Sequence, residues 1–302
     1  MQKQYALSRL SCLFQLTMED ETLVVDQFSS DGHGEKNVSP GEFGFICTQK
    51  NFRNLQPQHE LDDETIIATV RVMLFGKRDC FCFGTHFFQK ACLPKESKFS
   101  SATPIVLDSF DFDRVRDQGC KCPGGNIFNL EHVFFPINIE NYHWTMAYMN
   151  KKRKLLFYYD SCWKPHNTLG GKYLDKLMVY LREEHKSIYG TVLPEGPEDW
   201  ICQQTRFTMG PRQYDTYNCG VFIVFVIEAL TNLRVDPEIL FHFDSWKFDV
   251  EDMDKYRLRM GACILKKKIP DLPNLPEESE SQSTPESPFR DSEISQSSLS
   301  TP

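Results

Sequence analysis

The segment from Val133 to Asp160 reads VFFPINIENYHWTMAYMNKKRKLLFYYD and is the clearest secondary-structure signal in the chain. It holds three short runs of apolar and aromatic side chains, a composition typical of strands. We predict consecutive strands over residues 133–139, 144–149 and 155–159. The basic run 151–154 then lies between the last two strands, where a solvated turn is favoured over the alternative, a localisation signal.

Residues on either side of this segment carry helical patterns. Apolar side chains recur at helical spacing over 61–75, where Asp62 is the expected N-cap, and over 169–184. Residues 221–233 are apolar nearly all round, which predicts a buried helix, and residues 250–265 predict a further helix. Since helices and strands alternate without a strict βαβ rhythm, we expect an α+β fold rather than a doubly wound sheet.

The composition is that of a folded protein with a nearly neutral body. The 302 residues are 40% hydrophobic and 13% aromatic, enough to bury a substantial core and to exclude wholesale disorder. The net charge is −8, but residues 270–302 hold seven acidic side chains against one Arg, so most of this charge belongs to that end. The nearly neutral remainder shows no basic surface, which removes nucleic-acid binding as a first choice.

The chain divides into three zones by composition. Residues 1–54 form an N-terminal extension, whose loop-rich stretch at 29–44 either packs on the domain or is partly mobile. Residues 55–268 form the folded domain. Residues 269–302 are rich in Pro, Ser, Thr and Glu, a composition that predicts a disordered acidic tail.

Eleven cysteines are scattered along the chain rather than arranged as a disulfide framework. The spacing in Cys80-Phe-Cys82 and Cys120-Lys-Cys122 fits zinc poorly, so we favour reduced thiols over a metal site. The N-terminus lacks the apolar run and cleavage site of a signal peptide, and the longest apolar run, 221–227, is too short to span a bilayer. We therefore expect a soluble intracellular protein, nuclear, cytoplasmic or both, with no metal, cofactor or membrane partner.

Cys219 is the candidate nucleophile. It ends the sequence QYDTYNC, residues 213–219, and directly precedes the apolar helix. The positive end of a helix and its exposed N–H groups stabilise a thiolate, and the same groups can hold a tetrahedral oxyanion. Gly220 lets the backbone approach a substrate closely. A buried, inert cysteine is the alternative, and this segment alone leaves the two interpretations equally open.

A nucleophilic thiol needs a base and a group that orients the base. His143 opens the second predicted strand and Asp160 ends the third. In an antiparallel hairpin the start of one strand lies beside the end of the next, so a His143–Asp160 hydrogen bond is expected. Taken singly, the two would be a surface imidazole and a turn-capping carboxylate. Together with a thiol at a helix start, they favour catalysis.

Four candidate site residues follow one another along the chain in the order His143, Asp160, Gln213 and Cys219. This order resembles that of the ubiquitin-like-protein-specific cysteine proteases, the group that contains the sentrin-specific SUMO proteases. The resemblance covers about residues 55–268 and does not depend on these four side chains alone. Further segments resemble the opening of a family helix, a Thr-Phe-Phe strand after the first helices, the approach to the catalytic strand, and the last helix: 61–67, 85–88, 127–138 and 252–265.

The resemblance implies an α+β, papain-like cysteine protease fold of the SUMO protease type, with a Cys-His-Asp triad. Cys219 would attack the carbonyl after a C-terminal Gly-Gly and form an acyl-enzyme. His143 would activate the thiol and later protonate the leaving amine, and Asp160 would hold the imidazole tautomer. The Gln213 amide would stabilise the oxyanion, together with the backbone N–H of Cys219.

Substrate contacts are also implied by the resemblance. Trp144 would cover a narrow tunnel that accepts the two glycines, and Asp63 would meet a basic group on the modifier. Glu60 stands where SUMO-processing members commonly have a Trp that forms one wall of the tunnel, so the choice of modifier depends on this position. Asn218 stands where the family usually has Asp, a difference that we expect to alter the pH behaviour.

We expect a monomeric enzyme that hydrolyses peptide or isopeptide bonds after the Gly-Gly of a ubiquitin-like modifier, with SUMO as the first choice. The same chemistry on ubiquitin or a NEDD-type modifier is the first alternative. A non-catalytic module that binds such a modifier and an acyltransferase that uses the same Cys and His are alternatives of other classes. The intact set of four site residues argues against the non-catalytic module.

Overall fold

The computed structural model describes residues 2–30, 37–39, 43–93, 97–100, 105, 107–162, 168–206, 210–242, 246 and 248–272. The tail that the sequence predicts to be disordered lies outside these residues from position 273 onward, as does much of the loop-rich stretch at 29–44. Among the helices that are described, none combines the length and the apolar character needed to cross a membrane.

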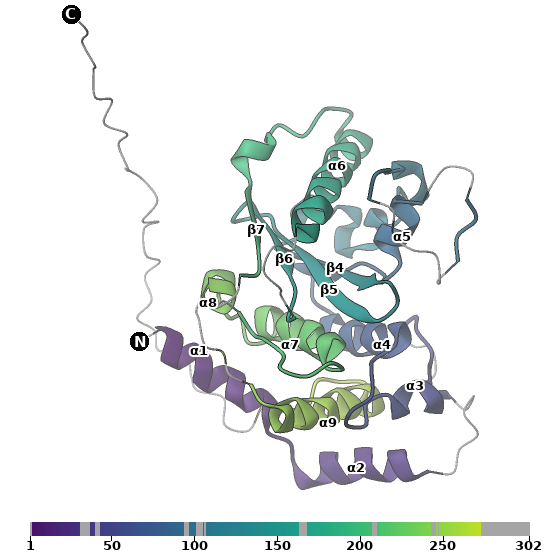
Figure 1. Cartoon of the computed structure of the whole chain (residues 1–302), viewed down its shortest axis with the longest axis vertical. Helices are drawn as coiled ribbons and strands as arrows, with labels where there is room; N and C mark the ends of the chain where they lie inside the picture. The colour runs from purple at the N-terminus through teal and green to yellow at the C-terminus, as the bar shows by residue number, and fades with distance from the viewer. Residues whose placement is uncertain are drawn as a thin grey trace, which may run out of the picture.

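A five-stranded mixed sheet runs through the middle of the molecule (Figure 1). Its strands, in spatial order, are β3 (Cys80–Cys82), β4 (His132–Ile139), β5 (His143–Asn150), β6 (Leu155–Tyr159) and β7 (Ile201–Gln204). β4, β5 and β6 are antiparallel neighbours, while β3 and β7 pair in parallel at the two edges. The three predicted strands are confirmed to within one residue at each end, and the α+β class is confirmed.

The central strands are apolar on both faces because both faces are buried. Phe134 and Met146 belong to one core, and Phe135 and Ala147 belong to the other. Successive side chains of a strand point to opposite faces, so this alternation divides the core into two layers. A sheet that is buried on both sides accounts for the unbroken apolar runs in the sequence.

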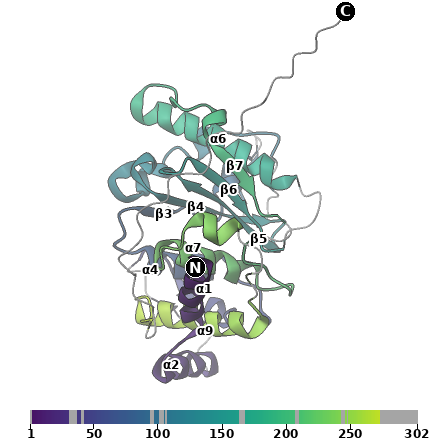
Figure 2. The ribbon, with the colours of Figure 1, turned by 90° about the vertical axis from the view of Figure 1, so that its left-hand side faces the viewer.

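Different helices cover the two faces of the sheet (Figures 1 and 2). One side carries α4 (Asp63–Leu74), α7 (Cys219–Thr231), α8 (Pro237–His242) and α9 (Val250–Lys266), and the other carries α5 (Phe87–Ala91) and α6 (Leu169–Tyr189). Every residue of α7 is buried, because the helix lies between the sheet on one side and α4 and α9 on the other. This position explains why its sequence is apolar nearly all round.

α4 begins where the sequence predicts it. The Asp62 side chain accepts a hydrogen bond from the N–H of Thr65 at 2.9 Å, which satisfies one of the free donors of the first turn. Its second oxygen accepts from the side-chain amides of Asn51 and Asn54, at 2.7 and 2.8 Å. These bonds fix the point at which the chain enters α4, and with it the position of the preceding residue, Leu61.

Residues assigned to the N-terminal extension also form helices, and these join the core next to α9. They are α1 (Gln2–Ser11), α2 (Met18–Ser29) and α3 (Gln49–Arg53), accompanied by the antiparallel pair β1 (Asn37–Ser39) and β2 (Cys47–Thr48). Leu10, Leu13 and Val24 are fully buried, and α2 packs along α9 (Figure 1). At the other end, Ile269 and Leu272, which the sequence assigns to the tail, pack against the same core.

The expected strand at 85–88 is wrong. Thr85 and His86 form a turn, and Phe87 begins α5. Phe87 and Phe88 are both buried and both contact the ring of Phe135. On a strand these neighbours would point to opposite faces, whereas one helical turn brings both rings to the same core.

The described part also contains short 3₁₀ helices: η1 (Cys12–Phe14), η2 (Phe112–Arg114), η3 (Gly119–Lys121), η4 (Pro123–Gly125), η5 (Ile127–Asn129) and η6 (Pro197–Asp199).

Candidate active site

A tight turn places His143 at the first position of β5. The turn between β4 and β5 closes with a hydrogen bond from the N–H of Tyr142 to the carbonyl of Ile139 at 3.1 Å. Its two central residues, Glu140 and Asn141, have positive φ values of 50° and 63°, the conformation of a hairpin turn that matches the strand twist. His143 therefore directly follows the β4–β5 turn and lies at the open end of the next hairpin, where β5 starts and β6 ends.

Asp160, the first residue after β6, orients the His143 ring. His143 Nε2 and Asp160 Oδ1 are 2.9 Å apart, so the hydrogen bond expected from the sequence is present. The same carboxylate oxygen accepts from the N–H of Cys162 at 2.9 Å, and the N–H of Asp160 donates to Thr205 Oγ1 at 3.0 Å. Since Asp160 is buried and held by these bonds, the ring has one fixed orientation, with Nδ1 left to exchange a proton with another group.

The environment of His143 favours the protonated ring. Burial by itself lowers the pKa of His143, but hydrogen bonds with Asp160 and with the Cys219 thiol outweigh this effect and raise the pKa to about 9. At neutral pH the imidazolium form is therefore favoured. An imidazolium beside a thiol is the partner that stabilises the thiolate form of a cysteine.

Cys219 is the first residue of α7 and is buried, with 2% of its surface exposed. The backbone N–H of Trp144, the residue after His143, donates to its Sγ at 3.4 Å. The first hydrogen bond within the helix runs from the N–H of Phe222 to the carbonyl of Asn218, at 3.0 Å. The N–H groups of residues 219–221 precede that bond and lie at the positive end of the helix, beside the thiol.

The 213–218 loop that leads into Cys219 is built around one carboxylate. Asp215 Oδ1 accepts from the N–H groups of Tyr217 and Asn218 at 2.9 and 2.8 Å, and Asp215 Oδ2 accepts from the Asn218 amide at 2.9 Å. The remaining oxygen of Asn218 accepts from Arg257 Nε at 2.9 Å. Asn218 thus uses its side chain both as a donor and as an acceptor, and its amide satisfies both Asp215 and Arg257.

Gln213 connects this loop to the end of β6. Its N–H donates to the carbonyl of Ser161 at 3.1 Å, and its Oε1 accepts from Ser161 Oγ at 2.7 Å. Its Nε2 donates one proton to the carbonyl of Asp215 at 2.9 Å. An amide nitrogen has two protons, so the second one is available to another acceptor. The side chain is buried and its position is set on both sides.

Trp144 is buried and packs between the start of α7 and the segment before α4. Its indole Nε1 donates to the carbonyl of Leu61 at 2.8 Å. A Cβ added to Gly220 would lie 3.0 Å from Leu61 Cβ, 3.2 Å from Ile66 Cδ1 and 3.2 Å from Trp144 Cδ1. Gly220 thus has a packing reason to lack a side chain, and its expected role in admitting a substrate stays a prediction.

The two acidic residues predicted to contact a substrate lie around the start of α4. Glu60 is exposed, and Leu61, the next residue, carries the carbonyl that binds Trp144. Asp63 is an ion-pair partner of His86, with Oδ2 3.2 Å from Nε2. Burial raises the pKa of the Asp63 carboxyl, and His86 offsets part of this rise. No local sequence pattern indicates this histidine, because the contact joins α4 to the turn before α5.

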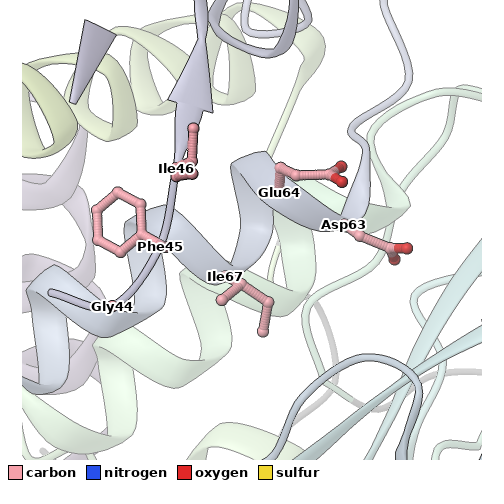
Figure 3. A pocket seen from close by; sticks show the side chains of 6 residues that line it. All are labelled: Gly44, Phe45, Ile46, Asp63, Glu64 and Ile67. Atoms are coloured by element: carbon pink, nitrogen blue, oxygen red, sulfur yellow. The ribbon is translucent and has the colours of Figure 1, made fainter. Parts of the chain in front are cut away.

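A pocket opens beside Asp63, between the first turns of α4 and the segment that leads into β2 (Figure 3). It is lined by Gly44, Phe45, Ile46, Asp63, Glu64 and Ile67. Ile46 is 57% exposed, so the surface combines apolar side chains with two carboxyl groups. A surface of this kind suits an apolar partner that carries a basic group.

The cysteine pairs form no metal site within the described residues. Cys80 and Cys82 lie on β3, and Cys120 and Cys122 lie at η3. All eleven cysteines belong to the described part of the chain, and each is a free thiol there. In that same part, no group of three or more His, Cys, Asp or Glu side chains is arranged to hold a metal ion.

Residues 109–267 match a family model described as the Ulp1 protease family, C-terminal catalytic domain. This match covers more than half of the chain. The chain belongs to the Ulp1 protease family. The matched residues include all four side chains that the sequence analysis selected by their order, from His143 to Cys219.

Curated relatives with similar sequences are also named as proteases. Sentrin-specific protease 2 of Rattus norvegicus is 23% identical over 224 residues, which cover 71% of this chain and 32% of the relative. Ubiquitin-like-specific protease 1 of Saccharomyces cerevisiae is 25% identical over 183 residues, which cover 58% of this chain and 24% of the relative. The chain thus corresponds to about a third or less of the length of these relatives.

A solved structure of the C-terminal Ulp1 protease domain, in complex with Smt3, the yeast ortholog of SUMO, has a similar fold. The TM-score is 0.65 at 21% sequence identity, and the alignment covers 84% of this chain and 96% of the other. At this identity the likeness establishes the fold. The fold of the SUMO protease type that the resemblance implied is therefore confirmed.

Proposed function

We propose that this chain is a cysteine protease that cleaves after the C-terminal Gly-Gly of a ubiquitin-like modifier, with SUMO as that modifier. The observation that carries the proposal is the His143–Asp160 hydrogen bond of 2.9 Å beside the Cys219 thiol at the start of α7. Membership of the Ulp1 protease family and the names of the relatives support the same chemistry. The proposed catalytic domain spans residues 55–268, between the N-terminal extension and the tail.

Acylation begins with the Cys219 thiolate and the His143 imidazolium. The sulfur attacks the glycine carbonyl carbon, and the carbonyl oxygen becomes an oxyanion. The free proton of Gln213 Nε2 and the N–H groups at the start of α7 stabilise this oxyanion. As the C–N bond breaks, His143 donates its proton to the leaving amine. The products of this step are a thioester on Cys219 and the released amine.

Deacylation reverses the role of His143. The ring, now neutral, accepts a proton from a water molecule whose oxygen attacks the thioester carbon. The C–S bond breaks, the modifier leaves with a C-terminal carboxylate, and the thiolate–imidazolium pair is restored. Asp160 keeps the same tautomer through both steps because its Oδ1 accepts from Nε2. Water supplies one oxygen of the carboxylate; one of its protons goes to His143 and the other is released to solvent.

Two parts of the surface serve the substrate in this proposal. Trp144 and Leu61, joined by a hydrogen bond, border the channel for the two glycines. Asp63 and Glu64, with the exposed Ile46, receive a basic and apolar surface of the modifier. Glu60 lies at the edge of the channel, where a Trp would add apolar cover, so this position discriminates between modifiers.

A panel of modifiers with C-terminal fluorogenic groups and electrophilic traps tests the proposal. We expect the wild-type chain to cleave the SUMO substrate and to form a covalent adduct with the SUMO trap at Cys219. Cys219→Ser should lower turnover by at least a thousandfold and still bind SUMO, because serine provides no thiolate at neutral pH. Activity of this variant within tenfold of wild type would refute the nucleophile assignment.

Glu60→Trp tests the choice of modifier in the same assay. We expect a higher kcat/KM for SUMO, because an indole over the glycines positions the scissile bond. Wild-type cleavage of ubiquitin or a NEDD-type modifier without SUMO cleavage would replace the substrate and leave the catalytic proposal in place. Binding of a modifier without turnover and without a covalent trap adduct would favour a module that only binds modifiers.

A further inference from the structure

Arg257 is a buried charge that forms no ion pair among the described residues, although Asp254 and Asp215 attract it. It lies on α9 and is 0% exposed. No Asp or Glu of the described part forms an ion pair with it, whereas Arg259, two residues later and equally buried, pairs with Glu228 at 2.8 Å. Burial lowers the pKa of the Arg257 guanidinium to about 10, so it remains charged at neutral pH. A buried charge of this kind is costly unless hydrogen bonds compensate for it.

The compensating acceptors come from two separate segments. Arg257 Nε donates to Asn218 Oδ1 at 2.9 Å, and Nη2 donates to the carbonyl of Tyr217 at 3.3 Å. Three further bonds reach carbonyls of the segment before α4: Asn54 at 2.9 Å, Gln56 at 3.2 Å and His59 at 2.6 Å. All the hydrogen bonds of this guanidinium therefore join the 213–218 loop to the 54–59 segment.

Both segments lead directly to the site. Residue 218 is followed by Cys219, and residue 59 is followed by Glu60 and Leu61, whose carbonyl holds the Trp144 indole. The 54–59 segment also contains Gln58 in a left-handed conformation, with φ of 65°. A non-glycine residue adopts this conformation at a cost, so neighbouring bonds must hold it. The Arg257 bonds to Gln56 and His59 lie on either side of it.

We propose that Arg257 is a positioning residue. It holds the 213–218 loop before Cys219 at a fixed distance from the Glu60–Leu61 edge of the glycine channel. Its fork of N–H groups reaches both segments at once, and no other described residue donates to both Asn218 and the 54–59 carbonyls. This inference rests on the proposed function, since it concerns the distance between the nucleophile and the bound glycines. None of the guanidinium hydrogen bonds goes to Cys219 or His143, so the proposed role is to position the site and not to take part in the reaction.

Arg257→Lys tests this inference, with Arg259→Lys as a matched control on the same helix. A lysine keeps the charge but cannot span the two segments. With a fluorogenic SUMO substrate we expect kcat to fall about 10- to 100-fold in Arg257→Lys, because small misplacements of reacting groups have effects of this size. KM should change less than threefold, since none of the Arg257 hydrogen bonds goes to Asp63 or Glu64. Arg259→Lys should keep kcat within threefold.

Asn218→Ala is the second variant, because it breaks the loop side of the connection and leaves the 54–59 side in place. If Arg257 acts through Asn218, the two substitutions should not add their effects. The kcat of the double variant Arg257→Lys, Asn218→Ala should then be no more than about threefold below that of the less active single variant. If the kcat losses of the two single variants instead multiply in the double variant, the connection is refuted. A kcat of Arg257→Lys within threefold of wild type would also refute it, as would equal losses in Arg259→Lys.

The alkylation rate of Cys219 separates this inference from the proposed function. Iodoacetamide labelling at pH 7, followed at the Cys219 peptide by mass spectrometry, needs no modifier substrate. We expect labelling to be at least fivefold slower in Arg257→Lys and unchanged in Arg259→Lys. If the wild-type chain cleaves no modifier but shows this difference, the proposed function fails and the positioning role of Arg257 stands. Equal labelling rates in wild type and Arg257→Lys would refute the positioning role.

Discussion

His143 is the residue that should make stability depend on pH. Its pKa is raised from 6.5 to about 9, so the folded protein binds the proton more tightly than the unfolded chain does. The resulting stabilisation is complete below pH 6.5 and is lost as the pH rises through 9. From the size of the shift, the free energy of unfolding should fall by up to about 3 kcal/mol over this interval.

Asp160→Asn should flatten this pH dependence, because the carboxylate is a main cause of the raised pKa. Urea unfolding of the wild type and the variant at several pH values between 6 and 9.5 measures the effect. We expect the two stability curves to converge as the pH approaches 9.5. Curves that stay parallel across the interval would show that Asp160 does not stabilise the charged ring.

Asn218 and Asp215 provide a second prediction at the scale of single residues. Asn218→Asp would place two carboxylates in contact where an amide now donates to Asp215 at 2.9 Å. Like charges at this distance disfavour ionisation, so the variant should lose about 2 kcal/mol of stability at pH 8 and recover part of it at pH 5. Urea unfolding at both values is the measurement.

Exchanging the two residues is the matched control for this prediction. Asp215→Asn combined with Asn218→Asp keeps one amide and one carboxylate and moves the charge next to Arg257. We expect kcat within threefold of wild type and a higher free energy of unfolding than for Asn218→Asp alone, because every donor again has an acceptor. If the double variant is less stable than Asn218→Asp alone, the hydrogen-bond pattern described for this loop does not determine its stability.

At the scale of the elements, the start of α7 packs closely against the segment before α4. Gly220→Ala would push its new methyl group against Leu61, Ile66 and Trp144, all within 3.0 to 3.2 Å. We expect a loss of about 1 to 3 kcal/mol from overpacking and a fall in kcat, since Trp144 also donates to the Cys219 sulfur.

Gly171→Ala on α6 is the control for the packing of Gly220. Apart from its chain neighbours and the backbone of its own helix, no atom lies within 4 Å of the added Cβ, and the position is exposed. Alanine favours the helix over glycine by about 0.5 to 1 kcal/mol, so this variant should be slightly more stable with unchanged kcat. Thermal unfolding of both variants compares the two effects. A melting temperature of Gly220→Ala at or above wild type would contradict the close packing.

At the scale of the whole molecule, the two ends of the chain should differ in their importance for folding. Deleting residues 1–17 removes Leu10 and Leu13, both fully buried, and the bond from Arg9 Nη2 to the carbonyl of Leu233 at 2.9 Å. Each buried leucine contributes about 2 kcal/mol, so this deletion should lower stability by more than about 4 kcal/mol.

A truncation after Leu272 should change the melting temperature by less than about 2 °C, because the sequence beyond it has no apolar face to dock. The truncation point must follow Leu272 rather than precede Pro270, since the Pro270 carbonyl accepts from Arg259 at 2.9 Å. Thermal unfolding of both deletions gives the comparison. A large destabilisation by the C-terminal truncation, or none by the N-terminal deletion, would contradict this assignment of the folded unit.

Features that depend on neighbours in the sequence were predictable from the sequence alone. The strands and the long helices followed from apolar periodicity, and Asp62 capped α4 as expected, because these signals are local. The His143–Asp160 contact was also predictable, since a hairpin brings its own strand ends together. The order of the four site residues indicated the family, and the matched residues 109–267 contain them all.

Only the tertiary structure decided which distant segments meet. Nothing local indicated that α1 and α2 belong to the main core, that Phe87 begins a helix rather than a strand, or that His86 pairs with Asp63. Arg257 was the hardest to interpret, although it lies at helical spacing between the buried Met253 and Met260. Its partners are mostly backbone carbonyls, and every residue has a carbonyl. Their identity depends on how the chain packs, which local sequence patterns do not encode.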